Sequence, residues 1–545
     1  MSASAVPSSR RAVQAVLALL LLNGLLSFNN VWPTPAIVPD HRLAPEFVGL
    51  WLGLLFVVAR WGAPSPRVLA GFTLVFMLLV LGRYGDVTVP ALFGRPVNLY
   101  WDGQQIPRFL WVSAQNLPWW MSTGAVAVVF LLVHAIYRLF AVFVRIAARD
   151  AAPYALRTRW AQVLTVLAVV LVIANISGVR ATWPVVSRAI VPTYIRQAIL
   201  LTAIFTDQRV GQTLPRAEAL DAALAAPPGS ALAALRGSDV YLMPLESYGA
   251  VVYDNPEAAA RLRPARERLA ADLAAGGFRV VSAFMRSPTF GGASDLAQLG
   301  MLSGLDLTDP LRHDLLLTTD RPTLITLFRA NGYRTFGFYP ALFWDWPERV
   351  FYGYDQFVEG RDLDYPGPEF GYWKIPDQYA AARFEQRFPR SADSPPRFVF
   401  FPTITCHLPF SPVPPYQTDP RQLLGDTPFD PADSARALAV KPDWLNMFPG
   451  YVAMVEYTYR WLGDYLLQPQ PRDTIYVLVG DHQPAASVSG EGASWDVPVH
   501  IVSRDPELLA RFTEQGFHTG LEPPREPRGG LHDLTTMMLR AFAQP

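Results

Sequence analysis

The chain has 545 residues, 46 basic residues against 46 acidic ones, and a single cysteine. This length predicts at least two folding units, because single hydrophobic cores usually stop growing beyond roughly 250 to 300 residues. The zero net charge argues against the broad basic surface that nucleic-acid binding needs. A hydrophobic content of 51% against 17% charged residues excludes a disordered chain. Cys406 alone cannot form an intrachain disulfide, so no disulfide framework is expected.

Apolar residues are concentrated before residue 206, in blocks that are too long and too free of charge for ordinary core helices. We therefore predict an N-terminal α-helical membrane domain with five transmembrane helices. The second and third blocks are short for a bilayer, which needs about 20 residues, so they depend on flanking residues. The first block also resembles a cleaved signal peptide, but four similar blocks follow it. The five blocks are approximately Ala12–Phe28, Phe47–Ala59, Val68–Gly82, Met121–Tyr137 and Trp160–Gly178.

Arginine placement predicts the orientation of these helices, because cytoplasmic loops carry an excess of basic residues. The arginines gather in the three segments that five crossings would leave on one side of the membrane. This pattern predicts a cytoplasmic N-terminus and places the chain after about Arg180 outside the cytoplasm. The arginines concerned are Arg10, Arg11, Arg60, Arg67, Arg138, Arg145, Arg149, Arg157 and Arg159.

The segment Val185–Phe205 is apolar but is interrupted by Arg188, Pro192 and Arg196. We interpret it as an interfacial amphipathic connector. A sixth crossing is the alternative, and it would place the rest of the chain in the cytoplasm. The predicted organisation is a transmembrane domain at 1–182, a connector at 183–236 and an extracytoplasmic catalytic domain at 237–545.

After Pro227, short β-rich runs alternate with helical stretches. This alternation predicts an α/β domain with a mostly parallel central sheet covered by helices on both faces. In such sheets, ligands bind at the carboxyl ends of the strands. Helices are expected at 256–275, 322–332 and 450–467. The expected strands are Asp239–Glu246, Phe278–Met285, Tyr333–Pro340, Arg397–Ile404, Thr474–Asp481 and Val497–Ser503.

Two of these strands end in residues that suit a metal ion. Glu246 ends the first strand, and Asp481 with His482 ends the fifth. Carboxylate oxygens and an imidazole nitrogen suit one divalent ion, zinc or manganese. Taken singly, each residue also fits a turn, a helix cap or a loop, so the prediction rests on their combination.

The segment 287–305 offers a candidate nucleophile. Gly291 and Gly292 allow a close approach of the backbone, and Ser294 opens a predicted helix that runs through Leu302. A hydroxyl there lies among unpaired backbone N–H groups at the positive end of the helix dipole, where a phosphate or sulfate would bind. The alternative is that Ser294 is only an N-cap.

The same segment resembles the nucleophile signature of the alkaline phosphatase and sulfatase superfamily. In that signature a Cys, Ser or Thr begins a helix, and a Ser/Thr-Gly pair follows about three turns later, as Ser294, Ser303 and Gly304 do here. Sulfatases that use formylglycine carry Pro and Arg where this chain has Leu296 and Gln298, which argues against that chemistry. The resemblance implies a sulfatase-like catalytic fold, Ser294 as catalytic nucleophile, and a metal bound by Glu246, Ser294, Asp481 and His482.

The predicted membrane anchor narrows this resemblance to membrane-embedded members. Lipoteichoic acid synthases, periplasmic glucan phosphoglycerol transferases and lipid A phosphoethanolamine transferases are similar in layout. The phosphoethanolamine transferases typically carry several disulfides, which Cys406 cannot supply, so the phosphoglycerol-transferase branch is the better match. That branch usually has Thr as the nucleophile, and Ser294 preserves the hydroxyl.

Two further stretches fit this branch as substrate-binding sites. His407 follows the fourth strand and resembles a histidine that contacts the substrate phosphate in lipoteichoic acid synthases. Trp344, Trp346 and Arg349 are similar to a Trp and an Arg that bind phosphoglycerol, although their spacing differs from the family's. The alternatives are a surface-loop histidine and tryptophans that only pack.

Together these residues suggest a double displacement. The Ser294 oxygen, activated by the metal, attacks the headgroup phosphodiester of a membrane phospholipid, and a glycan or glycolipid hydroxyl then attacks the phospho-serine with His407 assisting. The expected location is the bacterial inner membrane, with the catalytic domain in the periplasm. A membrane-anchored phosphodiesterase or sulfatase-like hydrolase, and a non-catalytic lipid-sensing protein with the same fold, are the alternatives.

Overall fold

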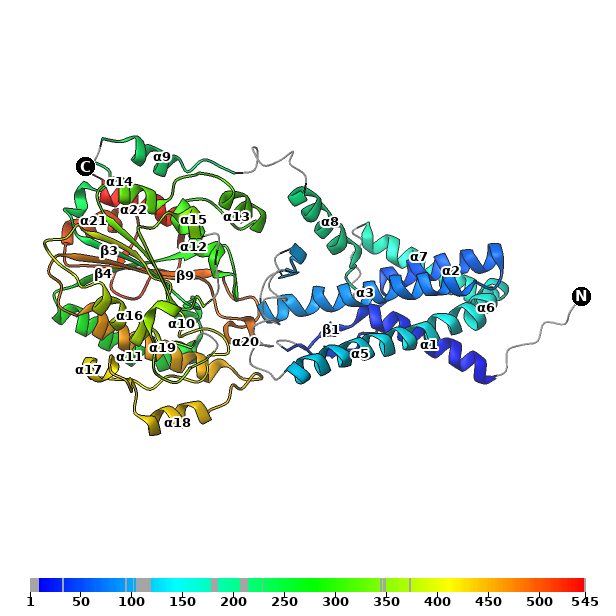
Figure 1. Ribbon diagram of the computed structural model, residues 1–545. Coiled ribbons are helices and arrows are strands. Elements are labelled where there is room, and N and C mark those ends of the chain that lie inside the picture. Colours follow the sequence, from blue (N-terminus) through cyan, green and yellow to red (C-terminus); the bar gives the residue numbers. More distant parts are fainter. Residues whose placement is uncertain are drawn as a thin grey trace, which may run out of the picture. The chain divides into compact units, whose positions relative to one another are not determined.

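The computed structural model describes residues 9–31, 34–93, 96–100, 102–103, 119–177, 185–205, 214–227, 229–343, 346, 349–371 and 374–543. Two compact units can be distinguished in Figure 1, one mostly helical and one built around a sheet. The helical unit comprises Met1–Ala91 and Pro96–Thr206, and the sheet unit comprises Leu92–Arg95 and Asp207–Pro545. The domain limits expected at 182 and 236 stay predictions.

Each of the five apolar blocks forms a helix of the first unit. The helices are α1 Ser9–Ser27, α2 Pro45–Trp61, α3 Pro66–Phe93, α5 Trp119–Ile146 and α7 Arg159–Ile176. The helix of α5 continues through the π-helical turn η1 Ala147–Ala151 into α6 Ala152–Arg157.

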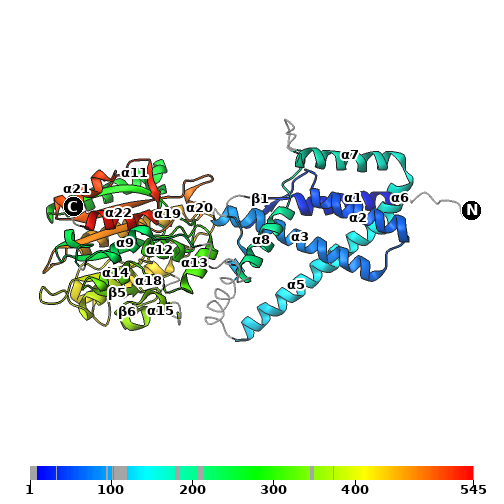
Figure 2. The same cartoon turned by 90° about the horizontal axis from the view of Figure 1, so that it is seen from above.

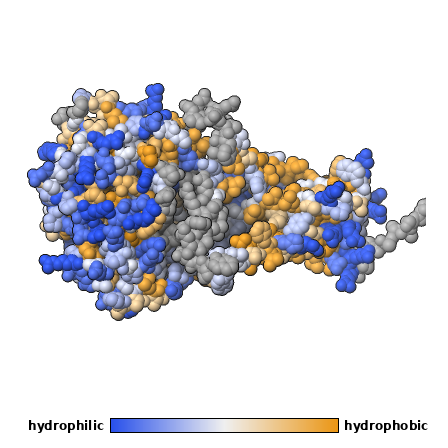
Figure 3. Space-filling view, in the orientation of Figure 1, coloured by the Kyte–Doolittle hydropathy of each residue, from blue (hydrophilic) through white to orange (hydrophobic). Residues whose placement is uncertain are grey.

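Among the described residues, four helical stretches are long and apolar enough to cross a membrane. They are Arg10–Ser27, Pro66–Leu92, Trp120–Arg157 and Arg159–Ile176. Helix α2 has 17 residues and is shorter, so the expected count of five crossings stays a prediction. Large apolar side chains such as Phe130 and Ile176, each 73% exposed, lie on the outside of these helices. Figure 3 shows hydrophobic side chains over much of this unit's surface, as a surface in contact with lipid would require.

Helix α8, Val191–Phe205, lies within the predicted connector, and buried polar contacts attach its start to the first unit. The Glu46 carboxylate accepts hydrogen bonds from the backbone amides of Ile190 and Val191, at 2.6 and 3.1 Å. The guanidinium of Arg83, which is 2% exposed, donates to the carbonyl oxygens of Phe28 and Arg188. The Glu46 contacts satisfy backbone amides at the start of α8, and the Arg83 contacts connect the end of α1 with the residues before α8.

The second unit contains a nine-stranded sheet with the order β10-β4-β9-β8-β3-β7-β5-β6, and β11 also pairs with β4. Strands β6, β5, β7, β3 and β8 run parallel to one another, whereas β9 is antiparallel to both β8 and β4. The strands are β3 Asp239–Leu245, β4 Arg279–Arg286, β5 Arg334–Tyr339, β6 Gln356–Glu359, β7 Arg397–Phe400, β8 Thr474–Gly480, β9 Asp496–Ser503, β10 His518–Thr519 and β11 Pro527–Gly530.

Helices cover both faces of this sheet, as Figures 1 and 2 show. One face packs against α11 Pro256–Ala275, α16 Asp377–Arg387 and α19 Phe448–Leu466. The other packs against α12 Ser294–Ser303, α14 Leu324–Ala330, α21 Pro506–Glu514 and α22 Asp533–Phe542. All seven residues of the central strand β3 are buried, as expected for a strand covered on both faces.

The remaining helices and helical turns of this unit are short and lie between the sheet elements. They are α9 Glu218–Ala225, η3 Ala233–Leu235, α10 Val251–Asp254, α13 Pro310–Leu317, α15 Arg349–Tyr352, η4 Gly360–Leu363, α17 Pro420–Leu423, α18 Pro431–Ala439 and α20 Ala486–Ser489. Two-residue strands β1 Asn29–Asn30 and β2 Ile37–Val38 pair in the first unit.

Phe328 in α14 lies in the core on this side of the sheet, and its replacement should lower the free energy of unfolding substantially. Phe328, 1% exposed, stacks on Phe398 with ring centroids 4.2 Å apart and contacts Tyr333 edge-on at 4.9 Å. Phe328→Ala should lower the free energy of unfolding by about 3–5 kcal/mol, because it removes buried area and leaves a cavity. Chemical denaturation of the purified protein measures the change. Val350→Ala, at a side chain that is 82% exposed, is the control and should change it by less than about 0.5 kcal/mol. Equal denaturation midpoints for the two variants would contradict this account of the core.

Candidate active site

The candidate metal ligands follow the carboxyl ends of two adjacent parallel strands. Leu245 at the end of β3 pairs with Gly480 at the end of β8, so Glu246 and Asp481 leave the sheet side by side. Both carboxylates and the His482 ring are buried, with exposures of 6%, 1% and 2%. Their ligand atoms all lie within 4.8 Å of one another. The structure thus brings together the three side chains that the strand ends predict.

Two glycines make this close approach possible. A Cβ on Gly480 would lie 1.9 Å from the carbonyl oxygen of Tyr248, and a Cβ on Gly249 would lie 2.0 Å from Oε1 of Gln483. Real Cβ atoms do not approach other atoms this closely, so these two positions require glycine while the backbones stay where they are.

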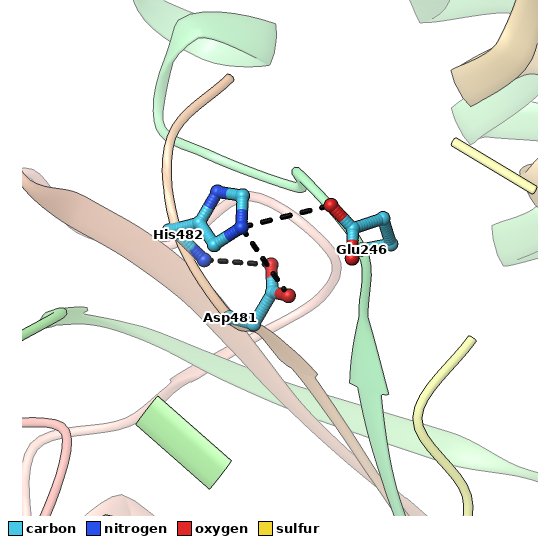
Figure 4. Close-up of side chains that lie close together, drawn as sticks. All are labelled: Glu246, Asp481 and His482. Atoms are coloured by element: carbon cyan, nitrogen blue, oxygen red, sulfur yellow. Dashed lines mark hydrogen bonds and ion pairs between the residues drawn. The ribbon is translucent and has the colours of Figure 1, made fainter. Parts of the chain in front are cut away.

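Figure 4 shows the three side chains converging on one point. Nε2 of His482 lies 3.6 Å from Oε1 of Glu246 and 3.6 Å from Oδ2 of Asp481. Burial and the nearby Asp481 charge raise the pKa of Glu246 well above its usual range. A divalent cation would offset this repulsion between two buried carboxylates.

The protonation of His482 follows from its neighbours. Nδ1 lies 2.7 Å from the carbonyl oxygen of Gln483, which can only accept, so Nδ1 carries the ring proton. In the neutral ring, Nε2 therefore has a lone pair directed at the carboxylates. Two carboxylates and this nitrogen are a donor set that zinc and manganese both accept, so the residues present fit the predicted metal.

The candidate nucleophile lies beside this donor set. Oγ of Ser294 is 3.1 Å from Nε2 of His482 and 3.5 Å from Oε2 of Glu246. Ser294 is the first residue of α12, as predicted, but it is not the N-cap. Ala293 occupies that position, in a left-handed conformation with φ of 60°. The Ser294 side chain makes no capping bond and points instead to the ligand cluster.

The loop before Ser294 is attached to the segment that carries the ligands. The hydroxyl of Ser287 donates to the carbonyl oxygen of Asp481 at 2.5 Å. The Gly291 amide donates to the carbonyl oxygen of Gln483 at 3.0 Å. Because Gln483 also accepts from His482, one carbonyl connects the nucleophile loop with the histidine ligand.

His407 lies farther along the chain from its strand than predicted. Strand β7 ends at Phe400 rather than Ile404, although hydrogen bonds from Phe401 and Thr403 keep the chain beside β3. Nδ1 of His407 lies 2.7 Å from the carbonyl oxygen of Leu408 and therefore carries the proton. Burial, with a smaller contribution from the nearby His482, lowers the pKa of His407 to about 4, so the ring is neutral at pH 7.

Asp377 fixes the segment that leads to His407. Its carboxylate accepts hydrogen bonds from the amides of Ile404 and Thr405, at 2.8 to 3.0 Å. Burial raises the pKa of Asp377 to about 6, while these backbone bonds oppose the increase. Cys406 lies between Thr405 and His407 in the sequence. Burial raises the pKa of its thiol well above the usual range, which argues against a nucleophilic thiolate.

Of the predicted phosphoglycerol-binding residues, Trp346 and Arg349 lie toward the edge strand β6. Trp346 packs against Tyr339, Tyr352 and Phe357, with ring centroids 5.2 to 5.9 Å apart. Arg349 forms an ion pair of 3.7 Å with Glu359. Trp344 lies outside the described residues. The contacts of Trp346 are those of a packing residue, and a substrate-binding role for these side chains stays a prediction.

Several residues that build the site have no recognisable signature in the sequence. Ser247, Gln483 and Asp377 contact the ligands or the His407 segment through backbone groups or short hydrogen bonds. Asp377 begins α16. An aspartate there is typical of any helix start, so its actual partners become visible only in three dimensions.

Several solved structures are similar to part of this chain at low sequence identity. No curated protein matches this chain. A protein of the alkaline phosphatase superfamily from Vibrio parahaemolyticus has a similar structure, with 16% identity, coverage of 56% of this chain and 66% of that chain, and a TM-score of 0.36. The lipoteichoic acid synthase LtaP from Listeria monocytogenes shows 14% identity, 59% and 78% coverage, and a TM-score of 0.35. The Streptococcus pyogenes phosphoglycerol transferase GacH shows 10% identity, coverage of 63% of this chain and 91% of that chain, and a TM-score of 0.33.

A family model gives the assignment. Residues 291–502 match the family described as Sulfatase. The matched range includes Ser294, His407, Asp481 and His482 and begins after Glu246. The sheet unit of this chain therefore contains a region that matches the Sulfatase family model, and the predicted sulfatase-like enzyme domain with a mostly parallel sheet is confirmed.

Proposed function

We propose that this protein is a metal-dependent, membrane-bound transferase. It moves a phosphoglycerol-type or phosphoethanolamine group from a phospholipid to a glycan or glycolipid hydroxyl through a phospho-serine. The observation that supports this proposal best is the position of Ser294, the first residue of α12. Its Oγ lies 3.1 Å from Nε2 of His482, which belongs to a buried donor set of three residues.

Each residue has a role in this scheme. A divalent cation held by Glu246, Asp481 and His482 would supply positive charge that favours the deprotonated form of a neighbouring hydroxyl. The first-turn amides of α12 stabilise negative charge on the phosphoryl oxygens next to Ser294.

The reaction has two steps. The Ser294 oxygen bonds to the headgroup phosphorus, the bond from phosphorus to the diacylglycerol oxygen breaks, and the proton ends on diacylglycerol. The acceptor hydroxyl then bonds to phosphorus, and Ser294 leaves and regains a proton. His407, which is neutral at pH 7, assists this second step by contacting the acceptor hydroxyl.

The apolar helices support a membrane-bound donor. A chain with four helices of membrane-spanning length lies next to phospholipids, so the donor never has to leave the bilayer. The arginine pattern favours the inner membrane, with the catalytic unit on its outer side.

Removing the nucleophile tests the covalent step. Ser294→Ala should reduce turnover at least about 1000-fold, because no other hydroxyl replaces the attacking oxygen. Intact-protein mass spectrometry after incubation with phospholipid should show a headgroup phosphate adduct on the wild type and none on the variant. Ser294→Ala should also keep the wild-type melting temperature. An adduct on the variant, or full activity, would exclude Ser294 as the nucleophile.

Product analysis separates transfer from hydrolysis. With phospholipid and a glycan acceptor, we expect the headgroup phosphate on the glycan and diacylglycerol as the second product. Without the acceptor, turnover should slow because the phospho-serine accumulates. Free headgroup phosphate released at the same rate in both reactions would instead identify a phosphodiesterase.

Asp377 predicts a pH dependence. The ionised carboxylate accepts the two backbone amides more strongly than the protonated acid does, so activity should fall as the pH decreases through about 6, the pKa of this buried group. Asp377→Asn should lower activity about 10-fold at pH 7.5, because the charged hydrogen bonds are worth roughly 1.5–3 kcal/mol, and should weaken this pH dependence. Asp393→Asn, at an exposed position, is the control. An unchanged pH profile in Asp377→Asn would show that Asp377 does not set it.

A further inference from the structure

Ser247, the residue after Glu246, contacts both carboxylates of the candidate site. Its backbone amide donates a hydrogen bond to Oδ1 of Asp481 at 2.8 Å, and its hydroxyl donates to Oε1 of Glu246 at 2.8 Å. The side chain is buried, with 2% exposure. One residue thus connects the ligand that follows β3 with the ligand that follows β8.

The backbone of Ser247 has a conformation that usually favours glycine. Its φ is 55°, in the left-handed region, which costs a residue with a Cβ roughly 1–2 kcal/mol. The conformation is held from α19, where the hydroxyl of Tyr451 donates to the carbonyl oxygen of Ser247 at 3.0 Å. A glycine would relieve this strain and keep the amide bond to Asp481. The hydroxyl that reaches Glu246 is the one contact that glycine would lose.

The Ser247 hydroxyl bonds to the Glu246 carboxylate, which is buried from water. Glu246 and Asp481 are buried next to each other, so each destabilises the charge of the other. The hydroxyl of Ser247 holds Oε1 of Glu246, while Oε2 lies 3.5 Å from Oγ of Ser294. Asp481 is held in the same way, since Oδ1 accepts from the amides of both Ser247 and His482.

We propose that Ser247 is a positioning residue that orients the Glu246 and Asp481 carboxylates for a divalent cation. This inference rests on the proposed function, because it assigns a role at the same site. Partners of this kind typically change metal affinity by 10- to 100-fold when they are removed.

Two variants separate the hydroxyl from the backbone. Ser247→Ala removes the hydroxyl and keeps the strained φ, whereas Ser247→Gly removes both the hydroxyl and the strain. We expect both to bind Mn²⁺ and Zn²⁺ about 10- to 100-fold more weakly than the wild type, in calorimetric titrations of the metal-stripped full-length protein. In the metal-free state, Ser247→Gly should melt no lower than the wild type, which shows that the weaker binding does not reflect unfolding. The control is Ser434→Ala in α18, which removes a buried serine hydroxyl away from the ligand segments.

Kinetics give a second readout. The kcat of both Ser247 variants should fall at low metal concentration and recover when the metal is saturating, as a purely structural defect would not. Wild-type affinity in Ser247→Gly would overturn the positioning role and leave the proposed function intact. Failure of the wild-type protein itself to bind either metal would overturn the proposed function together with this inference. If Ser247→Ala does not fold, Ser247→Gly decides the question alone.

Discussion

Two buried carboxylates that face each other are the feature on which this site depends. Parallel pairing of β3 and β8 places Glu246 and Asp481 at the same sheet edge, where burial and the Asp481 charge raise the pKa of Glu246. Backbone amides, the hydroxyls of Ser247 and Ser294 and the His482 ring surround them. Such an arrangement is costly in a fold that has no use for it, and it suits a protein that binds a divalent cation.

Much of the sheet unit could be predicted from the sequence, since periodicity and turn residues are local signals. The six predicted strands all exist, and the helix predicted at 256–275 has the bounds of α11. The short strands β6, β10 and β11, with four, two and four residues, carry too little pattern to be recognised. The end of β7 was placed too late because the apolar run continues past Phe400 while the chain leaves the strand.

The candidate site divides in the same way. Glu246, Asp481, His482 and Ser294 could be found because their positions at strand ends and at a helix start, taken together, resemble a known family signature. The structure brings these four side chains together. The residues that hold them could not be found, because a serine or an aspartate forms similar local bonds in many loops. The aromatic packing partners of Trp346 were likewise not predictable from the sequence, and its substrate-binding role stays a prediction.

The two glycines at the crossing of the ligand segments restrict how such a site can change over evolutionary time. Any substitution at Gly249 or Gly480 adds a carbon where another chain segment already lies, so the two ligand-bearing segments would have to separate. The ligand side chains can be substituted while the backbone stays in place, whereas a side chain at either glycine requires the two segments to move apart. A homologue that has lost its chemistry could therefore still retain both glycines, and their presence in a sequence would indicate the shape of the site rather than its activity.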